Sequence, residues 1–202
     1  MLRLLPLALA LALFAPGRAE AKLTCDSGKT YYKHARTRIF AVYEQTEVYV
    51  CSAHLRRPRR FDYINDGTAD GLYGWKVYGH RLAFLHAWTG GDSLGWLAGW
   101  VDLRTGQAAE ASVQPDHGIP FADSGESVAV APDGSVAALQ KVEGDTSEVI
   151  VYAQFGKRRF HAIRLLSTVE TGDVDPRSLA IANGNVTWTT TAGVIGSVPI
   201  NG

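Results

Sequence analysis

Short apolar runs separated by polar turns make up most of the chain beyond residue 35. Along residues 81–88, and again along 96–101, apolar or aromatic side chains recur at every second position. A period of two places successive side chains on opposite faces of a strand. Gly, Pro, Asn and Asp punctuate the runs, and no long 3.6-residue apolar stripe occurs after residue 21. The pattern predicts β-strands with little helix.

One hairpin pattern recurs along the chain. Residues 127–139 form an apolar strand, a Pro-Asp-Gly turn and a second strand, and residues 178–188 repeat them. Gly184 stands 50 residues after Gly134. Residues 72–84 match as an earlier copy. The repetition predicts a structure built from similar units.

A second set of strands interleaves with the first, at residues 49–55, 97–103 and 149–155. Each strand runs into a polar turn, and the strand ends are spaced by 48 and then 52 residues. Two independent markers therefore give one period of about 50 residues, which is the length of a four-stranded unit.

The hairpin Val128-Ala-Val-Ala-Pro-Asp-Gly-Ser-Val-Ala137 and the turn Asp102-Leu-Arg-Thr-Gly-Gln107 resemble blade motifs of secreted bacterial β-propeller proteins. The resemblance covers residues 36–200 and implies an all-β fold, a β-propeller-like array of about four antiparallel four-stranded units. A β-sandwich or an open repeat array is the alternative. The resemblance implies no activity, because such blades serve enzymes and binding proteins alike.

The N-terminus has the features of a cleavable signal peptide. Arg3 precedes an apolar run over residues 4–14, and Ala19-Glu-Ala21 has the small-x-small pattern of a cleavage site. The run is too short for a spanning helix, which needs about 20 residues. We therefore expect residues 1–21 to be removed and residues 22–202 to form a single secreted domain without a membrane span.

Two cysteines remain after the predicted cleavage, and in an oxidising compartment they are expected to pair as Cys25–Cys51. The last repeat ends near Ile200 without an obvious fourth strand, while an extra segment, residues 22–35, precedes the first repeat. One hypothesis is ring closure, in which this segment supplies the missing strand and the disulfide fastens the seam.

The chain contains 20 basic and 20 acidic residues, so no overall field attracts it to nucleic acid. The densest charge run is 56–60, Arg-Arg-Pro-Arg-Arg, and Lys157-Arg-Arg159 occupies the matching turn of a later unit. Such turns attract an anionic polymer or surface, although exposed hairpin tips are also commonly basic without a binding role.

No motif with a catalytic mechanism, a cofactor site or a metal site stands out. The six histidines are scattered singly, and the oxygen-rich segments 62–71 and 172–176 lack the spacing of a calcium loop. Ser124 and Ser127, near Asp116-His117, suggest a nucleophile only by sequence proximity.

Four of the five tryptophans occur within one unit and suggest an aromatic platform for sugar rings or apolar peptide groups. The alternative is that they fill the space between units. Exposure of Trp96 and Trp100 decides between the two. The four are Trp75, Trp88, Trp96 and Trp100.

These features predict a secreted, non-enzymatic binding or scaffold domain, with a protein, a glycan or another surface polymer as partner. The alternative is an extracellular hydrolase or lyase whose active site lies at the propeller axis. A pocket lined by carboxylates and at least two of four histidines would favour the enzyme. These are His34, His80, His117 and His161.

Overall fold

The computed structural model describes residues 23–42, 47–63, 71–90, 93–112, 122–142, 144 and 146–200. The predicted signal peptide lies outside these residues. Their secondary structure is all β, without helix. The strands are β1 (Lys29–His34), β2 (Thr37–Val42), β3 (Glu47–Cys51), β4 (Arg59–Tyr63), β5 (Leu72–Tyr78), β6 (Arg81–Gly90), β7 (Ser93–Asp102), β8 (Ala108–Ser112), β9 (Ala122–Val130), β10 (Val136–Val142), β11 (Ser147–Gly156), β12 (Arg159–Glu170), β13 (Ala180–Ala182), β14 (Asn185–Thr189) and β15 (Ile195–Pro199).

Neighbouring strands pair in chain order to form four antiparallel sheets. Sheet 1 contains β1–β4, sheet 2 contains β5–β8 and sheet 3 contains β9–β12, whereas sheet 4 contains only β13, β14 and β15 among the described residues. The predicted hairpins at Gly79, Gly134 and Gly184 are confirmed, and each of these glycines has a positive φ. The prediction of about four antiparallel units is therefore confirmed.

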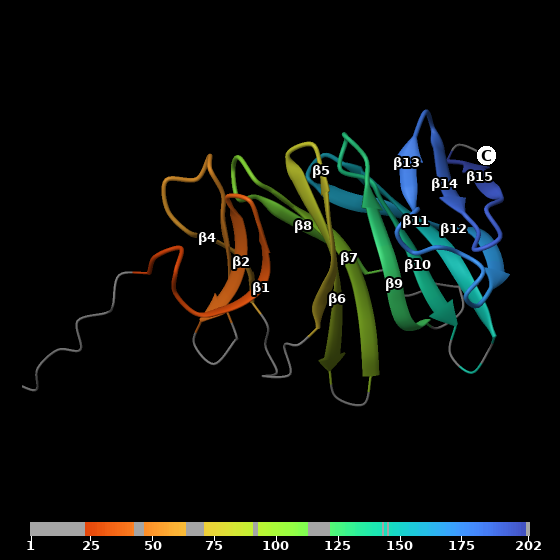
Figure 1. The fold of residues 1–202 in the computed structure, drawn as a ribbon, viewed down its shortest axis with the longest axis horizontal. Coiled ribbons are helices and arrows are strands. Elements are labelled where there is room, and N and C mark those ends of the chain that lie inside the picture. Colours follow the sequence, from red (N-terminus) through yellow and green to blue (C-terminus); the bar gives the residue numbers. More distant parts are fainter. Residues whose placement is uncertain are drawn as a thin grey trace, which may run out of the picture.

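The four sheets lie side by side in sequence order, from the orange sheet 1 to the blue sheet 4 (Figure 1). Each pair of neighbours encloses one hydrophobic core. Phe84 and Val50 pack between sheets 1 and 2, Trp100 and Val151 between sheets 2 and 3, and Val186 with Ile150 between sheets 3 and 4. Both faces of sheets 2 and 3 are consequently buried.

Polar side chains link neighbouring sheets at their hairpin ends. Trp100 Nε1 donates to the Gly134 carbonyl at 2.8 Å, and the Arg81 guanidinium, stacked on the Trp100 ring, donates to the carbonyls of Ala131 and Pro132. These bonds hold the β5–β6 turn against the β9–β10 turn. The hairpin turns of successive sheets therefore gather at one end of the array, the upper end in Figure 1.

A second set of links joins the first strands of sheets 2 and 3 to the loop before β13. Lys76 Nζ donates to Ser127 Oγ at 2.9 Å and to the Pro176 carbonyl at 2.8 Å, while Ser127 Oγ also donates to that carbonyl. Tyr78 donates to the Leu179 carbonyl at 3.2 Å. Burial lowers the pKa of Lys76 and raises the pKa of Tyr78 to about 12.

The Cys25–Cys51 disulfide is present, but the ring-closure hypothesis is wrong. The bond joins the segment before β1 to the last residue of β3, and β1 pairs with β2, so both ends of the bond belong to sheet 1. Arg38 fastens the same segment by donating to the carbonyls of Cys25, Ser27 and Gly28. The segment 22–35 supplies β1, an edge strand of sheet 1, and does not complete sheet 4, which lies at the opposite end of the array (Figure 1).

Candidate functional site

The β3–β4 turn is fixed to sheet 2 by one hydroxyl group. Ser52 Oγ accepts a hydrogen bond from the His54 amide at 3.2 Å and donates to the Leu103 carbonyl at the end of β7. The Leu55 amide closes the turn by donating to the Ser52 carbonyl at 3.2 Å. These bonds therefore hold the backbone of the turn from which the following arginine side chains extend.

The β7–β8 turn, on the other side of this contact, is held by Asp102. Its Oδ1 accepts from the amides of Arg104 at 2.7 Å and Thr105 at 3.1 Å. Gly106 has a φ of 74°, and a Cβ there would lie 2.6 Å from Arg59 Cβ. The aliphatic stem of Arg59 thus lies directly against this turn, which joins the basic residues of sheets 1 and 2.

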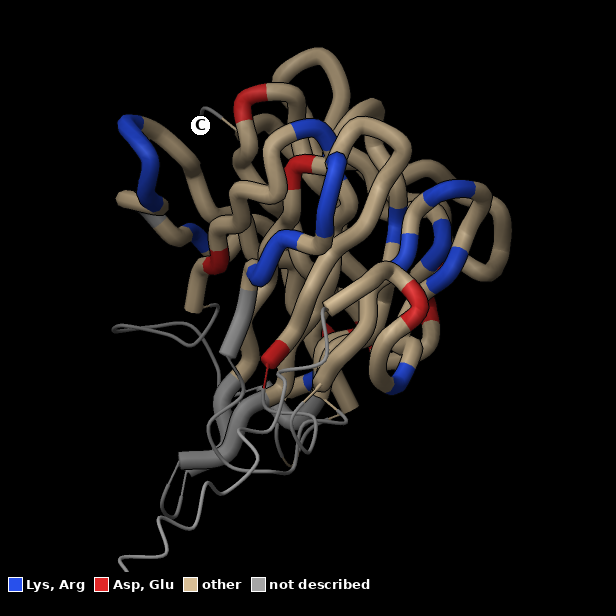
Figure 2. Tube along the Cα trace, turned by 90° about the vertical axis from the view of Figure 1, so that its left-hand side faces the viewer, with Lys and Arg blue, Asp and Glu red and all other residues tan. Residues whose placement is uncertain are grey.

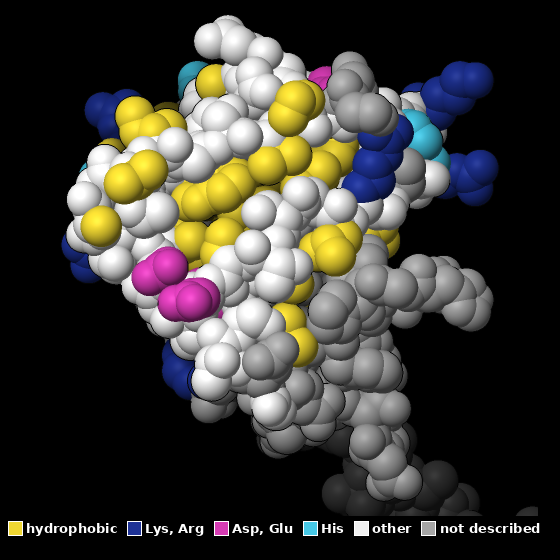
Figure 3. Space-filling view, turned by 90° about the vertical axis from the view of Figure 1, so that its right-hand side faces the viewer, with side chains coloured by type: hydrophobic (Ala, Val, Ile, Leu, Met, Phe, Trp, Pro, Cys, Tyr) yellow, Lys and Arg dark blue, Asp and Glu magenta, His cyan; other side chains and the backbone are white. Residues whose placement is uncertain are grey.

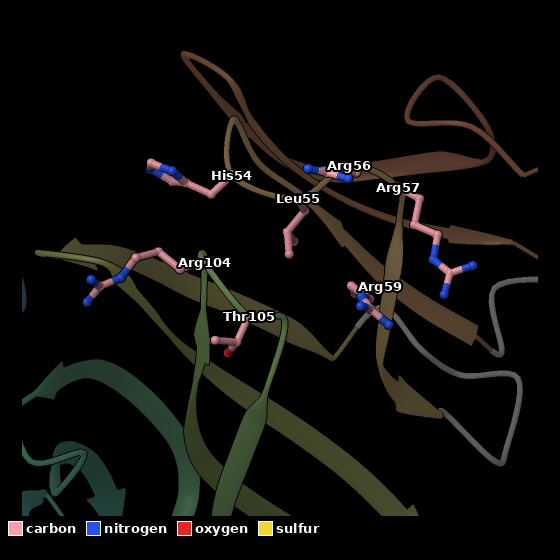
Figure 4. Close-up of a pocket in the computed structure, with 7 residues that line it drawn as sticks. All are labelled: His54, Leu55, Arg56, Arg57, Arg59, Arg104 and Thr105. Atoms are coloured by element: carbon pink, nitrogen blue, oxygen red, sulfur yellow. The ribbon is translucent and has the colours of Figure 1, made fainter.

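The two turns enclose a cavity of about 620 Å³. None of the described residues that line it carries a carboxylate, and all of its arginines are exposed. Leu55 points into the space between the turns, whereas Arg57 and Arg104 extend outward on opposite sides (Figure 4). We call this the arginine pocket. Its lining residues are His54, Leu55, Arg56, Arg57, Arg59, Arg104 and Thr105.

The spread of the guanidinium groups determines what the pocket can hold. A single small anion requires donors aimed at one point, whereas a polymer with repeated charges contacts donors distributed along a surface. No described residue pairs ionically with Arg56, Arg57 or Arg104 in the structure. By contrast, Arg60 next to the pocket is paired with Glu47 at 2.8 Å.

Further basic residues lie at the same end of the array. Lys157 and Arg158 form the β11–β12 turn, and both have positive φ. The upper part of the molecule carries blue segments on several separate loops (Figure 2). The carboxylates of the nearby turns, Asp102 and Asp133, are hydrogen-bonded within their own turns. We call this surface, comprising the arginine pocket and the β11–β12 turn, the basic end.

The sequence identified residues 56–60 and 157–159 as charge runs but did not assign Arg104 to a site. The signal for Arg104 was the repeat itself. In the sequence repeat, Arg56 and Arg104 follow Leu55 and Leu103 at matching positions. In the structure β3 already ends at Cys51, so Leu55 lies in the β3–β4 turn, whereas Leu103 directly follows β7. Packing of sheet 1 on sheet 2 then brings these positions to opposite sides of one cavity.

Trp96 and Trp100, whose exposure tests the predicted aromatic platform, do not form one. Trp96 is 7% exposed and Trp100 is 3% exposed, because both point into the core between sheets 2 and 3. Trp75 is partly buried against Tyr32 and Phe84. The side chain of Trp88 lies outside the described residues. The platform prediction is therefore wrong for Trp96 and Trp100.

The described histidines do not converge. His34 and His161 are exposed on β1 and β12. His80, in the β5–β6 turn, has its Nε2 3.2 Å from Oδ2 of Asp102, the last residue of β7. His117 lies outside the described residues. Ser127 is buried and donates to the Pro176 carbonyl, so it serves as part of the link between the sheets. The described members of this set, His34, His80 and His161, thus lie on separate elements and do not meet in the arrangement expected for a hydrolase or lyase.

Within the described part of the chain, no group of three or more acidic, histidine or cysteine side chains is arranged to hold a metal ion. Residues 64–70 of the oxygen-rich segment 62–71 lie outside that part. The described residues also include no helix that is long and apolar enough to cross a membrane.

No protein-family model and no curated protein matches the chain. Among solved structures, the crystal structure of BamB from Moraxella catarrhalis matches at 16% identity with a TM-score of 0.26, over 86% of this chain and 58% of that one. The chain therefore spans little more than half the length of that protein. A similarity at this level carries no argument about function, which has to come from the residues themselves. The disulfide is compatible with an extracellular or cell-envelope location.

Proposed function

We propose that the chain is an exported, non-enzymatic binding domain whose basic end binds an anionic surface polymer. The observation that carries the proposal is the arginine pocket, where arginines from two sheets line one cavity and have no ion-pair partner among the described residues. Removal of a signal peptide over residues 1–21 is part of the proposal, and the Cys25–Cys51 disulfide supports an oxidising location.

Charge placement supports this ligand class. The chain has a net charge of zero, so attraction to a polyanion depends on a local field. The hairpin turns concentrate that field at one end. At 0.1 M salt the field extends only about 10 Å, so binding requires direct approach of the polymer to the turns.

Rigidity supports binding by a preformed surface. Ser52 and Asp102 hold the backbone on both sides of the arginine pocket, so little backbone ordering accompanies binding. The side chains of Arg57 and Arg104 are exposed, however. Each contact with the polymer restricts a flexible side chain, and this loss of entropy reduces the binding free energy that the contact contributes. A useful affinity then comes from many modest contacts along a polymer.

The double substitution Arg57→Gln and Arg104→Gln is expected to weaken binding to heparin, used as the anionic probe, by roughly 30-fold at low salt. A basic side chain near an anionic surface contributes about 1 kcal/mol, and 1.4 kcal/mol corresponds to a tenfold change. The measurement is the dissociation constant from titration calorimetry, together with the salt concentration of elution from a heparin column.

The matched control removes the same charge elsewhere. Lys141 and Arg177 lie on β10 and in the loop before β13, away from the hairpin end. Lys141→Gln with Arg177→Gln is expected to change heparin affinity less than threefold. Equal losses in the two variants would mean that the attraction is set by total charge and not by the arginine pocket.

A further inference from the structure

The β11–β12 turn is built from two residues that rarely adopt its backbone conformation. Lys157 and Arg158 have φ values of 48° and 74°, and Gly156 pairs with Arg159 across them. A two-residue turn with positive φ at both positions favours Asn-Gly, because other side chains crowd the backbone in the left-handed region. Among the described residues, no other two adjacent non-glycine residues both have a positive φ.

The same chain forms this turn elsewhere with the favoured residues. In the β13–β14 turn, Asn183 and Gly184 have φ values of 51° and 75°. The two turns therefore share one backbone geometry and differ in their residues. Lys157 and Arg158 lower the stability of a turn that Asn-Gly would form without strain. Strain retained at a particular place is a reason to look for a function there.

The two basic side chains are available to a ligand, although the turn itself is firmly placed. Lys157 and Arg158 are exposed, and no described residue forms an ion pair with either. Phe155 and Phe160 flank the turn with ring centroids 5.1 Å apart. Phe155 also packs edge-on against Trp100 of sheet 2, at 5.3 Å. The aromatic contacts therefore fix the position of the charges relative to sheet 2.

The turn is the third member of a row of basic turns. In each of sheets 1, 2 and 3 the turn between the third and fourth strands is basic, with Arg57 in the first turn and Arg104 in the second. The first two turns enclose the arginine pocket. The third lies next to the second, because β8 contacts β12 and Trp100 near the end of β7 contacts Phe155.

The row crosses three sheets. Packed sheets lie about 10 Å apart, so the row extends over roughly 20 Å from the first turn to the third. Seen from the sheet 4 end, the largest group of Lys and Arg side chains lies in the upper half of the molecule, whereas hydrophobic side chains occupy the centre (Figure 3). The basic end is therefore an elongated surface that runs across the sheets.

We propose that an extended, linear polyanion crosses the array along this row, anchored at the arginine pocket and at the Lys157-Arg158 turn. The inference rests on the proposed function and adds to it the form of the ligand, which must reach across sheets 1, 2 and 3. Binding at one anchor raises the effective concentration of the polymer at the other. A small anion or a short fragment reaches only one anchor and binds more weakly.

The binding test compares heparin fragments of increasing length on the whole chain. The parent is expected to bind fragments longer than about 20 Å roughly 30-fold more tightly than fragments shorter than about 10 Å. Lys157→Asn with Arg158→Gly keeps the turn and removes both charges. This variant is expected to bind long fragments roughly 30-fold more weakly than the parent, and short fragments less than threefold more weakly. Arg57→Gln with Arg104→Gln is expected to weaken binding of both lengths.

Thermal unfolding tests the strain independently of any ligand. Lys157→Asn with Arg158→Gly is expected to raise Tm by about 2–4 °C, because the favoured residues then occupy both left-handed positions. The matched control, Lys157→Gln with Arg158→Gln, removes the same charges and keeps the strain. It is expected to unfold at the Tm of the parent and to bind long fragments as weakly as the Asn-Gly variant.

The outcomes separate this inference from the proposed function. A parent that binds heparin of no length would disprove both. A parent that binds every length equally, with binding still weakened by Arg57→Gln and Arg104→Gln, would overturn only the second anchor. Long fragments bound undiminished by the turn variants would overturn it as well. An unchanged Tm in the Asn-Gly variant would also count against it, because the turn would then have no loss of stability to explain.

Discussion

Replacing Cys25 and Cys51 together with serine is expected to lower the free energy of unfolding by about 3 kcal/mol, the value for closing a loop of this length. The bond spans 26 residues and holds the N-terminal segment on sheet 1. For a chain of this size the loss corresponds to a fall in Tm of about 6–12 °C. Equilibrium denaturation of the double variant measures it.

Reduction of the parent protein provides the control for this variant, because it breaks the same bond without changing the sequence. The two are expected to lose similar free energy. A free energy of unfolding for the double variant within 1 kcal/mol of the parent value would mean that the disulfide contributes little. The hydrogen bonds from Arg38 to the carbonyls of Cys25, Ser27 and Gly28 would then be enough to hold the segment.

Phe84→Ala is expected to lower the free energy of unfolding by about 3–5 kcal/mol, as for other large-to-small changes in a packed core. Phe84 is fully buried between sheets 1 and 2, with its ring 5.4 Å from Trp75 and 5.6 Å from Phe61. The substitution removes the largest fully buried side chain of the core between sheets 1 and 2. Urea unfolding with a constant m-value is the measurement.

Phe84→Leu is the matched control and is expected to cost less than half as much, because it fills most of the space that alanine leaves empty. A loss below 1 kcal/mol for the alanine variant would show that the space between sheets 1 and 2 closes readily. The arginine pocket would then lack the rigid support that the binding proposal assumes.

The repeating hairpins were predictable because their signals are local. A period of two and a Gly or Pro-Asp-Gly turn specify a hairpin such as β9–β10 without reference to the rest of the chain. The 50-residue spacing extended that prediction to the four sheets. The ring-closure hypothesis failed because local patterns do not say which sheet an N-terminal strand joins, and β1 pairs with β2 in sheet 1.

The tryptophans show a second limit. Alternation places Trp96 and Trp100 on one face of β7, but it does not say whether that face meets solvent. Sheet 2 packs between sheets 1 and 3, so both of its faces are buried and the alternation no longer separates inside from outside. The arginine pocket was hidden for a related reason, because its residues meet only when two sheets pack.

The most direct test of the central claim locates the polymer on the protein. Arginine side chains are modified with hydroxyphenylglyoxal, with and without bound heparin at low salt, and each site is quantified by mass spectrometry. Binding at the basic end predicts strong protection of Arg57 and Arg104 and unchanged modification of Arg177. Protection of all three to the same degree, or of none, would contradict the assignment of the basic end as the binding surface.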